Sequence, residues 1–165
     1  MTTFNRTYRS PKFHLCVHTT NDYHIGYDPA EERYSHYSFL SCGGGRYHAL
    51  VNGKFETHEV TEPKQLLYVG NYMNSHMVGE CFQNTRIITF NSWRKNEKWD
   101  GRLIDSGKIS SSNSYSCLIC YEGSCEVNGK IISELEYADL EKDKEYAVEV
   151  RQDSYVALFE LCQIT

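Results

Sequence analysis

Apolar and polar residues alternate with a period of two along most of the chain. In the segment 146–151, Tyr146, Val148 and Val150 alternate with residues that are mostly charged. The segment 13–18 follows the same pattern, with two histidines on its second face. Such alternation is typical of β-strands, whose successive side chains point to opposite faces. Because helical periodicity is weak throughout, the pattern predicts a predominantly β fold.

Asn-Gly dipeptides at 52–53 and 128–129 are the strongest turn signals in the chain. Both central positions of a tight hairpin turn favour positive φ, which Asn and Gly adopt readily. Short helical turns are expected at 28–33, where Asp-Pro suits a helix start, and near 138–144. The sequence therefore predicts strands joined by tight turns, with few helical turns.

The order of these features repeats once along the chain. Three pairs of matching segments follow one another in the same order: 37–45 with 115–123, 52–54 with 128–130, and 76–90 with 146–160. We interpret this collinear order as an internal duplication. It predicts a first half at 1–90 that includes the N-terminal strands, a connection at 91–101, and a second half at 102–165. The two halves are expected to share one core.

The predicted connection contains both tryptophans of the chain, Trp93 and Trp99. An exposed Trp can bind a partner, but each indole also buries a large apolar area when it docks on a core. We expect docking on the core rather than binding.

Composition limits the classes of partner. The 165 residues are 40% hydrophobic and 24% charged, which is a globular composition. The net charge of −5 would repel a polyanion, so nucleic acid is not an expected partner. No run approaches the roughly 18 to 20 apolar residues of a membrane helix, and the N-terminus has no apolar run typical of a secretory signal. Seven cysteines, an odd number, argue against a disulfide framework. We expect a reduced, cytoplasmic protein without a membrane partner.

Cys117, Cys120 and Cys125 are close in sequence, but their spacing is weak evidence for zinc. Residues three apart on a strand point to opposite faces, so two of these sulfurs would not easily meet one ion. We interpret them as packing residues. His14 and His18 share one face of the first strand and are interpreted as surface residues.

The segment 120–130 resembles the middle of a cupin, where a strand ends in a Gly turn and the next strand runs into Asn-Gly. Ala-Asp-Leu at 138–140 is similar to that family's Gly-Asp turn, with Ala in place of Gly, and 146–161 is similar to its final hairpin. The resemblance covers residues 115–162 and, more loosely, 34–90. It implies an all-β, cupin-like jelly-roll barrel built from two sequence-related halves, with closed edges and a central cavity.

The metal site that cupins usually hold does not carry over with the resemblance. The family places two His and one Glu before the Gly turn and a further His late in the repeat. Counted back from Gly45 and Gly123, these early positions hold Glu32, Tyr34 and Ser38 in the first half and Ser110, Ser112 and Ser116 in the second. The late His falls at His76 in the first half and at Tyr146 in the second. We therefore predict no cofactor.

A divalent transition metal remains the alternative, with His36 and His76 as its ligands. A metal site usually needs three or four protein ligands, and His48, Glu80 or Tyr34 would have to complete this one. Neutral His can also act as an acid or base without metal.

The candidate ligand-binding residues come from strand parity and the resemblance. His36 has the parity of Ser38, which the resemblance places facing the cavity, and His76 is laid over Tyr146, on an inward face. Both histidines are thus expected at one barrel mouth. The candidate set is His36, His76, Tyr34, Ser38, His48 and Tyr146.

Three functions fit these expectations. The first is a metal-free module that holds a small molecule in the barrel through Tyr, His and Ser side chains. The second is a small cupin enzyme of isomerase, lyase or dioxygenase type, using His36 and His76 on a sugar-like or carboxylated substrate. The third is a structural jelly-roll protein that assembles with copies of itself. The resemblance also implies a homodimer. We predict the binding module, because the sequence lacks the full set of cupin metal ligands while polar residues are expected to face inward.

Overall fold

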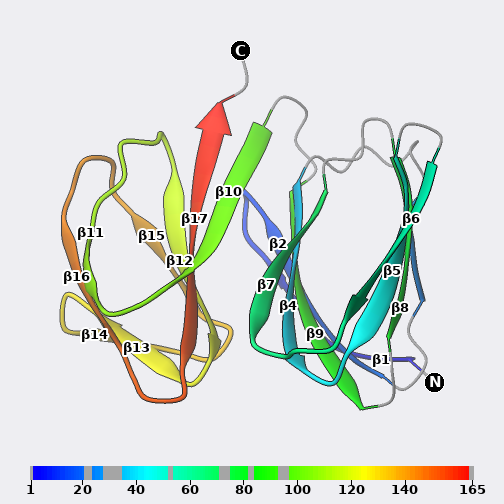
Figure 1. Ribbon diagram of the computed structural model, residues 1–165. Helices are drawn as coiled ribbons and strands as arrows, with labels where there is room; N and C mark the ends of the chain where they lie inside the picture. The colour runs from blue at the N-terminus through cyan, green and yellow to red at the C-terminus, as the bar shows by residue number, and fades with distance from the viewer. Residues whose placement is uncertain are drawn as a thin grey trace. The chain divides into compact units, whose positions relative to one another are not determined.

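The computed structural model describes seven stretches of the chain: 2–20, 24–27, 35–51, 54–70, 75–81, 84–92 and 97–163. These stretches form the antiparallel strands β1 to β17 and contain no helix. Accordingly, no helix within them is long and apolar enough to cross a membrane. The chain divides into two compact units, Met1–Asn96 and Glu97–Thr165, each described by itself below. Figure 1 shows the two sheets of each unit as two layers.

The first unit contains a five-stranded and a four-stranded sheet. The five-stranded sheet has the order β1 (Thr2–Arg9), β2 (His14–Thr20), β9 (Thr85–Ser92), β4 (Ser35–Cys42), β7 (Gln65–Gly70). The four-stranded sheet has the order β3 (His24–Tyr27), β8 (Ser75–Cys81), β5 (Gly45–Val51), β6 (Lys54–Val60).

The second unit contains two four-stranded sheets. One has the order β10 (Glu97–Ile104), β17 (Tyr155–Gln163), β12 (Ser116–Glu122), β15 (Tyr137–Leu140). The other has the order β11 (Gly107–Ile109), β16 (Tyr146–Val150), β13 (Ser124–Val127), β14 (Lys130–Ser133). Apart from β1, every strand of the first unit has a counterpart in the second at the same place in the order. The two units therefore have the same topology.

The turn that carries the chain from one sheet to the other is built alike in both units. Gly43 and Gly123 adopt φ of 83° and 73°, a left-handed conformation that favours glycine. The amide of Gly44 donates to Thr85 Oγ1 at 3.1 Å, and the amide of Ser124 donates to the Ser154 hydroxyl at 3.0 Å. Gly123 thus corresponds to Gly43 in the structure, and not to Gly45 as the sequence comparison placed it.

An apolar cluster fills the inside of the second unit. Both sheets contribute to it, and its members are Leu118, Cys120, Cys125, Val127, Ile132, Leu140, Tyr146, Val148, Val156 and Leu158. Along β16 the alternation is that of the sequence, since Tyr146 and Val148 are buried and Ala147 and Glu149 are exposed. On β12, by contrast, residues of both parities are buried. This cluster defines the inner face of each sheet.

Two local expectations are corrected by the strands. Most of the predicted connection at 91–101 is strand, because β9 ends at Ser92 and β10 begins at Glu97. Trp99 lies in β10 and is fully buried, as expected for docking. A helical turn near 138–144 is wrong for its first residues, since β15 pairs Ala138 with Leu118. Trp93 and the turn at 28–33 lie outside the described residues. The core shared between the halves stays a prediction.

Candidate functional site

The inner face of the first unit can be located by comparison with the second. A β-bulge precedes the Gly turn in both units, between Leu40 and Cys42 and between Cys120 and Glu122. Two residues before each bulge, Ser38 pairs with Thr89 and Leu118 pairs with Leu158. Directly opposite residues of antiparallel strands share a face. Ser38 and Thr89 therefore occupy the inner-face positions that Leu118 and Leu158 hold in the second unit.

Two rows of polar residues cross the inner face of the five-stranded sheet. One row joins Cys16, Thr89 and Ser38 on β2, β9 and β4. The next row joins His14, Asn91 and His36 on the same strands. We call these six residues the polar inner rows. His36 belongs to them through its backbone pairing, and its side chain lies outside the described part.

Three residues of these rows are withdrawn from solvent. Thr89, Asn91 and Ser38 are 1%, 4% and 9% exposed. The Asn91 amide donates to Thr89 Oγ1 at 3.4 Å, and Thr89 Oγ1 donates to the Cys16 carbonyl at 3.5 Å. Both bonds are long. Because hydroxyl and amide groups cost free energy to bury unless they are hydrogen-bonded, these bonds make this face a polar patch inside the unit.

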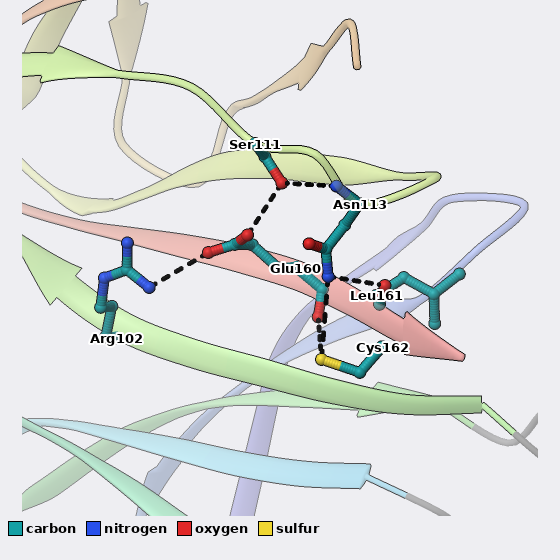
Figure 2. A network of polar contacts seen from close by, with 6 residues as sticks. All are labelled: Arg102, Ser111, Asn113, Glu160, Leu161 and Cys162. Atoms are coloured by element: carbon teal, nitrogen blue, oxygen red, sulfur yellow. Dashed lines mark hydrogen bonds and ion pairs between the residues drawn. The ribbon is translucent and has the colours of Figure 1, made fainter. Parts of the chain in front are cut away.

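In the second unit, polar side chains bond to one another around the position that corresponds to Asn91 (Figure 2). Glu160, the counterpart of Asn91, accepts from Arg102 at 3.1 Å and from the Ser111 hydroxyl at 2.8 Å. The Asn113 amide donates to the Leu161 carbonyl at 3.0 Å. These bonds tie the segment before β12 to β17. In the second unit the row that joins Ser116 and Glu160 is therefore polar as well, while the row that joins Leu118 and Leu158 belongs to the apolar cluster.

A second polar group in the second unit involves Tyr115, Asp139 and Cys117. Tyr115 donates its hydroxyl proton to Asp139 Oδ1, and its ring meets Trp99 edge-on at 5.5 Å between centroids. Burial raises the pKa of Tyr115 and of the Cys117 thiol above their ordinary values. Because a thiol with a raised pKa stays protonated, Cys117 is not an activated nucleophile.

The predicted site residues are distributed over both units. Ser38 is buried on the polar inner rows. Tyr146 is buried in the apolar cluster of the second unit, where its hydroxyl accepts the Glu141 amide at 2.9 Å. His48 and His76 belong to β5 and β8, with side chains outside the described part. Tyr34 also lies outside the described residues.

The strand register separates His76 from the position of Tyr146. Gly45 pairs with Cys81 in the first unit and Cys125 with Val150 in the second, each two residues after the Gly turn. Counting back along β8 and β16 makes Met77, and not His76, the counterpart of Tyr146. A shift of one residue moves a strand position to the opposite face.

His76 instead shares its strand face with His48 and with Arg46. Leu50 pairs with His76, and Arg46 lies on the same alternate positions of β5. The guanidinium of Arg46 forms an exposed ion pair with Glu59 at 3.1 Å. The register therefore does not bring His36 and His76 to one inner face.

The described side chains of the polar inner rows do not by themselves provide the ligand set of a transition metal. Zinc and related ions take three or four imidazole, thiolate or carboxylate ligands. The described side chains of the rows carry hydroxyls, one amide, one thiol and one imidazole. No group of three His, Cys, Asp or Glu residues suited to a metal ion occurs within the described stretches. We therefore assign no step to a metal.

Sequence reasoning missed Thr89 and Asn91 and interpreted His14 as a surface residue. A signal was present, because Thr89 and Asn91 alternate with Ile88 and Phe90 on one strand. That alternation shows two faces without showing which of them is the inner one. Only the register with β4 and the bulge place the polar face inside.

Comparison with known proteins supports the fold. No protein-family model matches the chain, and no curated protein matches its sequence. HutD from Pseudomonas fluorescens SBW25 has a similar structure, with a TM-score of 0.68 at 12% identity over 99% of this chain and 89% of that one.

Two further solved structures link the fold to cupins. A cupin 2 conserved barrel domain protein from Leptotrichia buccalis has a TM-score of 0.54 at 13% identity, over 99% of this chain and 89% of that one. Bacillus subtilis oxalate decarboxylase, a protein with Mn(II) centres, has a TM-score of 0.61 at 6% identity, over 92% and 69%. The fold is cupin-like and all-β, as the sequence predicted.

Proposed function

We propose that the first unit is a binding module that holds a small polar molecule against the polar inner rows. One observation carries this proposal. Ser38 and Thr89 occupy positions where the topologically equivalent unit has Leu118 and Leu158 in its apolar cluster. Polar residues at core positions cost stability and are retained where they serve a site.

The chemistry of the rows favours a ligand rich in hydroxyl, carbonyl or amide groups. Ser and Thr hydroxyls both donate and accept, and the Asn91 amide offers two donors and an acceptor. The described members include no lysine or arginine. A neutral or weakly charged polar compound is therefore expected to fit better than a strong anion.

In this proposal the two units have different roles. The second unit has a filled interior and an edge held by Glu160, so it acts as a scaffold. The first unit has the same strand order and carries the polar inner rows on its five-stranded sheet. The shared topology supports the proposed duplication, after which one copy kept a binding face. The homodimer and the cytoplasmic compartment stay predictions.

A thermal-shift screen of the full chain tests the proposal. The panel would contain sugars, polyols, small carboxylates and amino acids. We expect at least one compound to raise the melting temperature of the wild type. Thr89→Val and Asn91→Leu should each weaken binding of that compound at least tenfold, or about 1.4 kcal/mol.

Ser116→Ala is the matched control for this screen. Ser116 is a fully buried residue of the second unit, and it pairs with Glu160 as His36 pairs with Asn91. This variant should bind the compound as the wild type does. If binding is lost in Ser116→Ala and kept in Thr89→Val, the compound binds in the second unit, and this outcome would contradict the proposal.

A further inference from the structure

The Thr89 hydroxyl has two hydrogen-bond partners on the five-stranded sheet of the first unit. Its Oγ1 donates to the Cys16 carbonyl oxygen on β2 at 3.5 Å, and it accepts a hydrogen from the Asn91 amide at 3.4 Å. These roles cannot be exchanged, because a carbonyl oxygen only accepts hydrogen bonds and an amide nitrogen only donates them. The single hydroxyl proton of Thr89 is therefore directed at Cys16.

This arrangement makes Thr89 ready to accept a further hydrogen bond and unready to donate one. A threonine hydroxyl has one proton and two lone pairs, and one lone pair faces the Asn91 amide. No other residue in the described part of the chain bonds to Thr89 Oγ1. A ligand donor would add a bond at the second lone pair, whereas a ligand acceptor would have to draw the proton away from the Cys16 carbonyl.

Thr85, at the start of the same strand, divides its hydroxyl in the same way but serves the fold. Its Oγ1 donates to the Gly44 carbonyl at 2.8 Å and accepts from the Gly44 amide at 3.1 Å. Both bonds are shorter than those of Thr89, and both hold the backbone after the Gly turn. At Thr89 one partner is a side chain and both bonds are long, so its hydroxyl contributes less to the fold and can serve a ligand.

The neighbouring side chains favour a ligand donor that carries no charge. The described side chains of the polar inner rows include no Asp or Glu, since they are those of His14, Cys16, Ser38, Thr89 and Asn91. An ammonium group bound there would find no counter-charge among them, and burying an unpaired charge costs far more than burying a neutral polar group. Hydroxyl and amide N–H groups are neutral donors and therefore fit this face better.

We propose that Thr89 determines the specificity of the polar inner rows and selects neutral ligands that present a hydroxyl or amide N–H over ligands that carry acceptors alone. This inference rests on the proposed function and narrows its ligand class. Alcohols, and amides with an N–H, should bind in preference to ketones and esters of the same shape.

An NMR titration of the full chain with two pairs of compounds of matched shape tests this selection. The first pair is 1,4-cyclohexanediol and 1,4-cyclohexanedione, and the second is 2-piperidone and δ-valerolactone. In each pair only the first compound has a hydrogen-bond donor, which is a hydroxyl in one case and an amide N–H in the other. We expect the wild type to bind at least one donor compound about tenfold more tightly than its partner, as one added hydrogen bond allows.

Variants of Thr89 assign the preference to its hydroxyl. Thr89→Val should abolish the preference, because valine keeps the shape and has no lone pair to offer. Thr89→Ser restores a hydroxyl at this position and should restore the preference. Ser116→Ala, in the second unit, is the matched control and should show the preference of the wild type.

Three outcomes would overturn this inference: no binding of either donor compound, equal affinities within each pair, or a preference that survives in Thr89→Val. Equal affinities that both fall in Thr89→Val would leave the proposed function standing, because Thr89 would then give its proton to the ligand. The proposed function fails by a different result, in which the compounds found by the thermal-shift screen bind Thr89→Val and Asn91→Leu as tightly as the wild type.

Discussion

At the scale of single residues, Gly123 has two reasons to be glycine. Its φ of 73° is left-handed, and a Cβ there would lie 2.1 Å from Ser154 Oγ and 2.8 Å from Ser154 Cβ. Ser154 is also the acceptor that holds the Ser124 amide after the turn. Any side chain at 123 would therefore displace the bond that shapes the passage between the sheets.

Gly123→Ala should lower the free energy of unfolding by about 3 kcal/mol, from left-handed strain together with the steric conflict. Gly129→Ala is the matched control, since Gly129 has a φ of 81° but open space around its Cβ position. It should cost only about 1 kcal/mol. Urea unfolding of both variants measures the difference, and equal losses would contradict the role given to Ser154.

Thr89→Val separates a binding role from a structural one. The substitution keeps the shape of the side chain and removes the hydroxyl, whose bond to the Cys16 carbonyl is long. Without ligand, the free energy of unfolding should change by less than about 1 kcal/mol. A loss of several kcal/mol by urea unfolding would mean that Thr89 serves the fold and would count against the polar inner rows as a site.

At the scale of elements, β12 carries thiols whose ionisation opposes the folded state. Burial raises the pKa of Cys117 above its ordinary value of 9.0. Above about pH 9 the unfolded chain releases this proton while the folded chain keeps it, so stability falls as pH rises. Below pH 9 both states hold the proton and the contribution is fully present.

Cys117→Ser should therefore flatten the decline in stability between about pH 9 and pH 11, because serine does not titrate there. Urea unfolding at a series of pH values measures the slope. Cys42→Ser, at an exposed thiol, is the control and should leave the slope unchanged. If the slope is the same in Cys117→Ser and in wild type, the loss of stability at alkaline pH does not come from the titration of this thiol.

The strands themselves were predictable, and their register was not. Period-two alternation identifies strands such as β16, and Asn-Gly at 128–129 marks a hairpin turn, where Asn128 has a φ of 48°. Sequence matching placed His76 over Tyr146, one residue away from Met77, which the pairing makes its counterpart. A match between residue types in two segments of the sequence does not show which backbone positions pair in the sheet. Because a single slip exchanges the faces of a strand, the expectation that His76 faces inward depended on that one residue.

At the scale of the molecule, one topology occurs twice with different residues at one inner row, where Ser38 and Thr89 in the first unit correspond to Leu118 and Leu158 in the second. The sequence comparison found the two segments that surround each Gly turn, and it placed Ser38 on an inner face. It could not find Thr89 or Asn91, since their significance comes from strands that are distant in sequence and adjacent in the sheet. The contrast at this row emerges only when both units are compared position by position.

A crystal structure of the full chain, purified without added ligand and then soaked with the compound found in the thermal screen, tests the central claim most directly. The account predicts that the compound lies within hydrogen-bond distance of Ser38, Thr89 or Asn91, while Leu118 and Leu158 remain in contact with their own cluster. A compound bound among the cluster residues of the second unit, or one that makes no hydrogen bond to Ser38, Thr89 or Asn91, would contradict it.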